Sequence, residues 1–159
     1  MSGIDWGDLF DAGMFIGALL EGDPRHAEAL PFVEAARAGT IRVCTTTGII
    51  SEVYGALTWQ QAVPQRTPEQ AAEVIVRLLE LPSLIRILPD STEAALKTME
   101  IAAEHNLTAR RIHDARHVAA ALTAGVTRAY TYDADDWKLF AGDGLTIVGP
   151  PSTLLRLSP

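Results

Sequence analysis

The chain has 159 residues, 48% of them hydrophobic and 21% charged, which predicts one folded domain and excludes wholesale disorder. The formal net charge of −7 argues against a protein that holds nucleic acid by bulk electrostatic attraction. The apolar stretches are too short to cross a bilayer, and no signal peptide is expected at the N-terminus. Cys44 is the only cysteine, which excludes an internal disulfide and suits a cytoplasmic protein.

Helix-capping signals divide the chain into helical segments. Asp23-Pro24 predicts a helix start, Thr67-Pro68 with Gln70 predicts a capping box, and Asp90 with Glu93 gives a weaker box. Asn106 and Gly125 stand where helices commonly end. The expected helices span residues 13–21, 24–38, 48–61, 68–80, 91–105 and 110–124. Pro31 is expected to kink or divide the second of these helices.

Short β-rich runs fill the gaps between the helices. The expected strands are residues 8–11 (a weak pattern), 41–45, 84–88, 127–132 and 145–148. Strands that alternate with helices predict an α/β fold with a mostly parallel sheet covered on both faces. Binding sites in such sheets form beyond the carboxyl ends of the strands, where Asp11 ends the first strand and Asp133 ends the fourth.

Four acidic residues stand beside apolar segments, where an unpaired carboxylate is unfavourable. They are Asp11, Glu52, Asp114 and Asp133. A divalent cation with oxygen ligands satisfies several buried carboxylates at once. If the fold gathers these residues, they predict an acidic pocket for Mg²⁺ or Mn²⁺, and the natural chemistry of such a pocket is phosphodiester hydrolysis.

Each acid also has an ordinary alternative explanation. Asp11 suits a helix N-cap, and Glu52 lies just off the apolar stripe of its helix, where a solvated glutamate is common. Asp114 is four residues from Arg110, a spacing that favours a weak surface ion pair. Asp133 follows a strand, and acidic residues are frequent in turns.

Basic residues are concentrated around Asp114. Arg110, Arg111 and Arg116 lie there with His113 and His117, which is compatible with weak RNA binding and also with a solvated helix face. Zinc is disfavoured because only the two histidines of this group have helical i,i+4 spacing and no cysteine lies nearby.

The order and spacing of the acids resemble the PIN domain family, most closely the single-domain VapC-type ribonuclease toxins of toxin–antitoxin modules. The matching segments include Asp11-Ala12-Gly13-Met14-Phe15-Ile16, Ile49-Ile50-Ser51-Glu52-Val53, His113-Asp114-Ala115 and Thr131-Tyr132-Asp133. The tail at 145–150 is similar to the family's last strand. The resemblance covers essentially the whole chain, so residues 1–159 are expected to form a single PIN-like domain.

The resemblance implies a three-layer α/β/α fold, a homodimer, an antitoxin partner and an RNA substrate cut to leave a 5′-phosphate and a 3′-hydroxyl. It assigns Mg²⁺ or Mn²⁺ to Asp11, Glu52, Asp114 and Asp133, with Asp136 competing with Asp133 for the fourth position. The chain departs from the family pattern at Ala12 and Gly13, where Ser, Thr or Asn is usual.

Two alternatives to a nuclease remain open. The departures at Ala12 and Gly13 suit a PIN-like module that binds RNA or protein without cutting. An α/β phosphoacceptor domain would also gather acids around Mg²⁺, but it needs a well-placed lysine, and the chain has only Lys97 and Lys138.

Helix 68–80 spreads its apolar residues over more of its circumference than one core-facing stripe requires. Either the helix forms part of a homodimer surface or it is buried on two sides. Its apolar residues are Ala71, Ala72, Val74, Ile75, Val76, Leu78 and Leu79.

Overall fold

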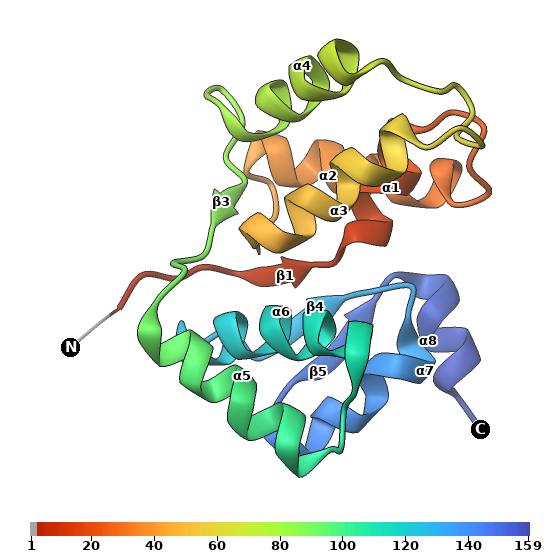
Figure 1. The fold of residues 1–159 in the computed structure, drawn as a ribbon. Coiled ribbons are helices and arrows are strands. Elements are labelled where there is room, and N and C mark those ends of the chain that lie inside the picture. Colours follow the sequence, from red (N-terminus) through yellow and green to blue (C-terminus); the bar gives the residue numbers. More distant parts are fainter. Residues whose placement is uncertain (1–2) are drawn as a thin grey trace.

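The computed structural model describes residues 3–159 and contains one five-stranded parallel sheet in the order β3-β2-β1-β4-β5 (Figure 1). Helices cover both faces of the sheet, so the predicted three-layer α/β/α architecture is confirmed. The strands are β1 (Asp8–Phe10), β2 (Val43–Thr45), β3 (Arg86–Ile87), β4 (Arg128–Tyr130) and β5 (Thr146–Gly149).

The helices divide between the two faces according to the strand order. In Figure 1 the helices before β3 lie on one side of the sheet, and those between β3 and β5 lie on the other. The first group is α1 (Ala12–Leu19), α2 (His26–Ala38), α3 (Thr47–Thr58) and α4 (Pro68–Leu79). The second group is α5 (Thr92–Glu104), the 3₁₀ turn η1 (Ala109–Arg111), α6 (Ile112–Thr123), α7 (Ala134–Trp137) and the 3₁₀ segment η2 (Lys138–Asp143). The last helix, α8 (Pro151–Leu157), follows β5.

The neighbouring strands β1 and β4 send the chain to opposite faces. The segment after β1 enters α1, and the segment after β4 enters α7. Such a divergence leaves a crevice at the carboxyl ends of the two strands, which is where parallel sheets bind ligands. Asp11 and Asp133 directly border this crevice.

The central strand β1 carries two core residues and one polar residue, Asp8. Leu9 and Phe10 are fully buried, and the Phe10 ring packs 4.9 Å from the Tyr130 ring, measured between centroids. Asp8, at the start of the strand, accepts a hydrogen bond of 3.0 Å from Arg128 Nε on β4. This cross-strand ion pair explains why an acidic residue is tolerated in a central strand. On the neighbouring strand β2, Cys44 is fully buried, as its position in a predicted strand indicated.

The predicted capping box at Thr67 is present and starts α4. Two other helix starts were misplaced. α2 begins at His26 rather than Pro24, because the Asp23 carboxylate accepts the Arg25 N–H within a turn. α5 uses Ser91, not Asp90, as its N-cap, and the Ser91 hydroxyl accepts the N–H of Ala94.

Pro31 does not divide α2, which continues from His26 to Ala38. Proline lacks the N–H that would bond to the carbonyl four residues earlier, so the helix forgoes one backbone hydrogen bond. Ala29, Val33 and Ala36 of this helix are buried in the core, and this packing holds the segment helical across the proline.

α4 buries a single stripe rather than two faces. Ala71, Ile75 and Leu78 are buried, whereas Val76 is 46% exposed. Of the two alternatives for this helix, burial on two sides within the domain is therefore excluded, and part of the apolar surface of α4 faces solvent. No helix in the described range 3–159 is long and apolar enough to span a membrane.

Candidate acidic metal site

Asp11 is the most deeply buried of the four predicted acids. It lies directly after β1, is 3% exposed, and accepts a hydrogen bond of 2.8 Å from the Thr131 hydroxyl. It occupies the N-cap position of α1, but its side chain makes no regular capping hydrogen bond. Burial raises the pKa of Asp11 to about 7; the electrostatic interaction with His117, the Ala12 N–H and the Thr131 hydroxyl oppose this shift, while Asp133 adds to it.

Asp114 and Asp133 approach the same crevice from the first turn of α6 and from the segment after β4. Burial raises the pKa of each carboxyl. Asp133 further raises the pKa of Asp114, whereas the indole N–H of Trp137 lowers it without making a hydrogen bond of regular geometry. The two carboxylates are therefore electrostatically coupled.

Glu52 reaches the site from α3 and is held by His117. The Glu52 side chain is 41% exposed, and its Oε1 lies 2.8 Å from His117 Nε2. The other ring nitrogen, Nδ1, lies 3.0 Å from the Thr46 hydroxyl. A neutral ring satisfies both contacts if Nε2–H donates to Glu52 and the Thr46 O–H donates to Nδ1. Glu52 also raises the pKa of Asp114 and of Asp133.

His117 fits neither RNA contact nor a solvated helix face, the two interpretations of the basic group around Asp114, because its side chain is only 1% exposed. Its helix turns it inward, three residues from Asp114, against the N-terminus of α3. Gly48 permits this approach, since a Cβ at that position would lie 2.8 Å from His117 Cε1 and 3.0 Å from Arg116 Nη1. His117 is thus a buried support for Glu52.

Three of the predicted acids, Asp11, Asp114 and Asp133, have raised pKa values, and the charge of Glu52 adds to the shift at Asp114 and Asp133. The four side chains therefore lie near one another beyond the carboxyl ends of β1 and β4. They do not form a closed ring of ligands. Within residues 3–159, the one group of three metal-capable side chains whose ligand atoms all lie within 4.8 Å is Glu104, His105 and Asp143. A closed ring of protein ligands is not required for a hard divalent cation such as Mg²⁺, which takes few carboxylate ligands and retains several waters.

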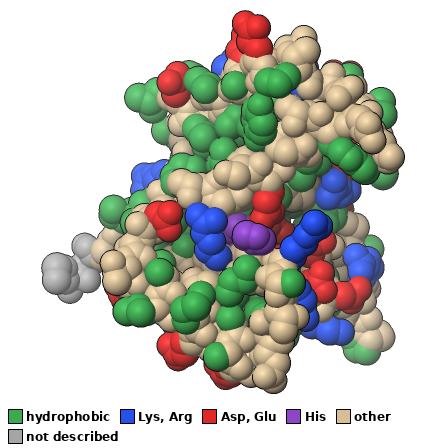
Figure 2. All heavy atoms as spheres, in the orientation of Figure 1, with side chains coloured by type: hydrophobic (Ala, Val, Ile, Leu, Met, Phe, Trp, Pro, Cys, Tyr) green, Lys and Arg blue, Asp and Glu red, His purple; other side chains and the backbone are tan. Residues whose placement is uncertain are grey.

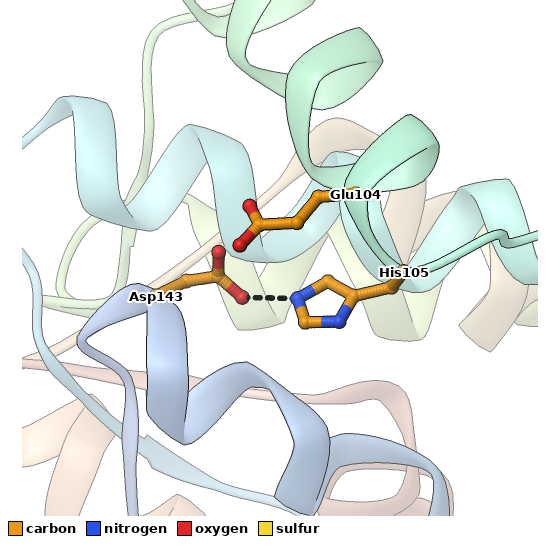
Figure 3. Close-up of side chains that lie close together, drawn as sticks. All are labelled: Glu104, His105 and Asp143. Atoms are coloured by element: carbon orange, nitrogen blue, oxygen red, sulfur yellow. Dashed lines mark hydrogen bonds and ion pairs between the residues drawn. The ribbon is translucent and has the colours of Figure 1, made fainter.

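The group of Glu104, His105 and Asp143 lies elsewhere in the fold (Figure 3). It joins the end of α5 to the end of η2, and Asp143 precedes β5, so the group is at the amino edge of the sheet. His105 Nε2 and Asp143 Oδ2 are 2.6 Å apart and satisfy each other. We assign this pair to the attachment of α5 to η2.

Asp136 lies beside Asp133, on the first turn of α7. Its charge raises the pKa of Asp133, and its backbone N–H donates to the Asp133 carbonyl at 3.1 Å. Asp133, in contrast, influences the pKa of both Asp11 and Asp114. Asp133 is thus linked electrostatically to two of the other predicted acids, whereas Asp136 raises the pKa of Asp133 alone.

Two supporting residues were not singled out from the sequence. The Thr131 hydroxyl donates to Asp11, and its oxygen also accepts the Asp133 N–H at 3.0 Å. Ala129 is fully buried on the same strand, and alternation by two residues would have placed Thr131 on that inward face. Thr131 thus supplies a hydroxyl to a site whose first motif has Ala12 and Gly13 where Ser, Thr or Asn is usual.

Arg25 is the second supporting residue that was not singled out from the sequence. It forms an ion pair of 2.8 Å with Asp23, lies 5.5 Å from the centroid of the Tyr132 ring, and lowers the pKa of Asp133. A Cβ on Gly13 would stand 2.9 Å from Arg25 Nη1, so glycine allows the guanidinium to lie against α1. No simple spacing rule relates Arg25 to the acids.

Basic side chains border the crevice, as predicted. Figure 2 shows acidic, basic and histidine side chains in a band across the middle of one face. Arg116 Nη2 lies 3.7 Å from Asp90 Oδ2. The ion pair between Arg110 and Asp114, the ordinary alternative explanation for Asp114, is absent from the described residues, because Arg110 belongs to η1 and precedes the first turn of α6.

The family model for the PIN domain matches residues 9–142, so the chain belongs to the PIN domain family. The predicted family is thereby confirmed. No curated protein matches the chain by sequence.

Solved structures share the fold at low sequence identity. A VapC20 toxin of Mycobacterium tuberculosis, described as cleaving the sarcin–ricin loop, is 19% identical with a TM-score of 0.66; the match covers 89% of this chain and 98% of that one. A toxin–antitoxin complex from Klebsiella pneumoniae is 22% identical with a TM-score of 0.59, covering 90% and 97%. FitAcB from Neisseria gonorrhoeae is 19% identical with a TM-score of 0.60, covering 89% and 96%.

Proposed function

We propose that this protein is a metal-dependent endoribonuclease of the VapC type, the toxin of a toxin–antitoxin pair. The observation that carries the proposal is the convergence of Asp11, Glu52, Asp114 and Asp133 on the crevice between β1 and β4. Membership of the PIN family and a structural neighbour described as an RNA-cleaving toxin support it.

Asp11 and Asp114 are the principal ligands for Mg²⁺ or Mn²⁺ in this proposal, and Glu52 and Asp133 complete the site or position water. The ion supplies charge neutralisation and Lewis acidity toward a phosphodiester. Thr131 fixes the orientation of Asp11, and His117 fixes that of Glu52. Holding carboxylates from separate elements in place reduces the reorganisation that the reaction requires.

The bordering arginines give the acidic protein a local affinity for RNA. Arg25 lies against Gly13 at the start of α1 and Arg116 against Gly48 at the start of α3, each partly neutralised by an acidic partner, Asp23 and Asp90. Binding through so few cations is weak and sensitive to salt. This suits transient capture of substrate by a chain with net charge −7.

Substitution of Asp114 by Asn tests the proposal, because it keeps the side-chain shape and removes the charge. The variant is expected to retain the fold. Its rate of RNA cleavage should fall by more than the roughly 10- to 100-fold that is typical when an outer-shell partner of a metal ligand is removed. Isothermal titration with Mn²⁺ should show weakened binding, independently of activity. Cleavage at the parent rate, from a preparation free of other nucleases, would contradict the assignment.

An antitoxin would inhibit RNA cleavage by inserting a side chain into the same acidic site. Structural neighbours include toxin–antitoxin complexes, and an Arg or Lys from an antitoxin would neutralise the acids through charge-assisted hydrogen bonds and exclude the cation.

We also propose a homodimer, supported by apolar side chains that remain exposed on α4, such as Val76.

The alternative is a PIN-like module that binds RNA without cutting it. The absence of a hydroxyl or amide at Ala12 and Gly13 favours it, although Thr131 provides a hydroxyl on Asp11. RNA binding by the parent protein without metal-dependent cleavage would establish this alternative.

A further inference from the structure

A second hollow opens beside the acid site, at the same carboxyl edge of the sheet. Its volume is about 250 Å³, and it lies between α5, α6, the first turn of α3 and the segment after β3. The walls are mainly apolar and include Leu88, Ala95, Met99 and Ile112.

Helix α6 forms the wall between the hollow and the acid site. Ile112, Arg116 and Ala120 recur every four residues and line the hollow. Asp114 and His117 lie on the adjoining face of the same helix and belong to the acid site. A ligand in the hollow would therefore stand one helix face away from the candidate metal ligands.

The first turn of α3 closes the same wall. Thr46 lines the hollow, and its hydroxyl lies 3.0 Å from the His117 ring, which in turn holds Glu52 at 2.8 Å. Arg116 passes beside Gly48 at this point, so its guanidinium borders both the hollow and the acid site.

The rim of the hollow carries free hydrogen-bonding groups. In the part of the chain that the structure describes, the side chains of Thr47, Asp90 and His113 make no hydrogen bond to another protein group; Asp90 has only its longer ion pair with Arg116. An apolar chamber with polar groups at its mouth suits a flat ring whose edge bears donors and acceptors.

We propose that this hollow is a nucleobase subsite, which takes the base of a nucleotide next to the scissile phosphodiester while Arg116 lies near the phosphate. This inference rests on the proposed function, because it takes RNA as the substrate. Single-stranded RNA is recognised through unstacked bases inserted between side chains. A cavity of about 150 Å³ holds a benzene ring, so a volume of about 250 Å³ accommodates one base.

The test fills the hollow without disturbing the core. Ala95 is exposed on α5 and lines the hollow, so Ala95→Phe places a ring inside it. Ala103→Phe is the matched control, because Ala103 is exposed on the same helix but does not line the hollow. Both variants leave the four acids and their supports unchanged.

Cleavage of a random-sequence RNA pool, followed by sequencing of the product ends, reports the base preference around the cut. The parent and Ala103→Phe are expected to share a preference at one position within two nucleotides of the cut. Ala95→Phe should reduce that preference about fivefold or more, which corresponds to the lower end of the free energy gained by stacking one base. Binding of Mn²⁺ should stay unchanged. An identical preference in all three proteins would overturn the subsite.

A second measurement does not depend on cleavage. Adenosine and guanosine 5′-monophosphate, titrated at millimolar concentration, should shift the methyl NMR signals of Met99 and Ile112 in the parent and in Ala103→Phe, but not in Ala95→Phe. If the parent cuts no RNA, the proposed function fails, and these shifts decide the subsite alone. Methyl signals that respond to protein concentration and not to nucleotide would assign the hollow to self-association and refute the subsite.

Discussion

The Thr131 hydroxyl donates a hydrogen bond of 2.8 Å to Asp11 Oδ2, joining residues 120 positions apart in the chain. Both residues are almost completely buried, at 0% and 3% exposure. The contact ties the carboxyl ends of β1 and β4 together at the point where the four acids meet, so the stability of the fold and the geometry of the site depend on the same hydrogen bond.

Replacing Thr131 by Val tests this bond, because valine keeps the shape and removes the hydroxyl. We expect a loss of about 1–3 kcal/mol in the free energy of unfolding, since a buried group is left without its partner. Urea denaturation measures the change. Thr131→Ser is the control and should retain most of the stability; equal losses in the two variants would point to packing instead of the hydroxyl.

The stability of the metal-free protein should fall as the pH rises. Burial raises the pKa of Asp11 from its ordinary value of 3.8 to about 7 in the folded protein, so the folded state holds this proton more tightly than the unfolded state does. The stabilisation is complete below about pH 4 and is lost as the pH rises through about 7. Thermal denaturation between pH 5 and 8 in a chelator measures this, and Asp11→Asn should flatten the dependence.

Added Mn²⁺ should raise the melting temperature more at pH 8 than at pH 5. Binding to Asp11 requires the ionised carboxylate, and burial opposes ionisation at the lower pH. Parallel melting curves with and without the ion give the comparison. A larger effect at pH 5 would show that the ion binds somewhere other than this site.

The fourth acid is expected to be Asp133 and not Asp136. Asp133 is coupled to Asp11 and Asp114, whereas Asp136 lies on α7 beside Asp133. Calorimetric titration with Mn²⁺ should therefore show weaker binding for Asp133→Ala than for Asp136→Ala. The reverse order would mean that the chain after β4 presents the later residue to the ion.

His117 should affect the metal site mainly by holding Glu52. His117→Leu removes the donor to the Glu52 carboxylate, and we expect metal affinity to fall about 10- to 100-fold. His117→Gln can present an N–H in a similar place and should recover part of the loss. Failure of glutamine to recover any affinity, in a variant that melts like the parent, would argue against the positioning role.

Inhibition by a cognate antitoxin should depend on one basic residue of that partner. Replacing it by alanine should weaken both affinity and inhibition, because the acids would lose the charge that occupies them. Unchanged inhibition would exclude the blocking of the acid site. Light scattering of the isolated protein across concentration tests the homodimer, and a monomeric mass at high concentration would refute it.

The sequence predicted the layered fold because helix caps and β-rich runs are local signals. Thr67 and Gln70 form the capping box that their spacing indicates. The helices after β4 were missed for local reasons too: α7 has only four residues, and η2 is a 3₁₀ segment. The proline at the start of α8 is a helix signal that the preceding Gly149 and Pro150 obscured.

The site was harder to predict than the fold because its supports are tertiary contacts. The acids could be found from their apolar surroundings and from family motifs. The role of His117 depends on partners in α3, 65 and 71 residues away, and that of Arg25 depends on the packing of Gly13 and Tyr132. Neither contact leaves a local pattern in the chain.

The strand order has a consequence for biosynthesis. β1 is central, but its partner β4 is made much later, and the acid site also needs Asp114 and Asp133. At ordinary elongation rates, roughly 4 to 17 seconds separate the synthesis of β2 from that of β4. During this interval the edge of β1 that pairs with β4 in the folded protein has no partner. The ribosome-bound chain also lacks two of the four carboxylates of the site. A chain released early by truncation would therefore carry an incomplete site and an unpaired strand edge, which favours its removal by chaperones and proteases.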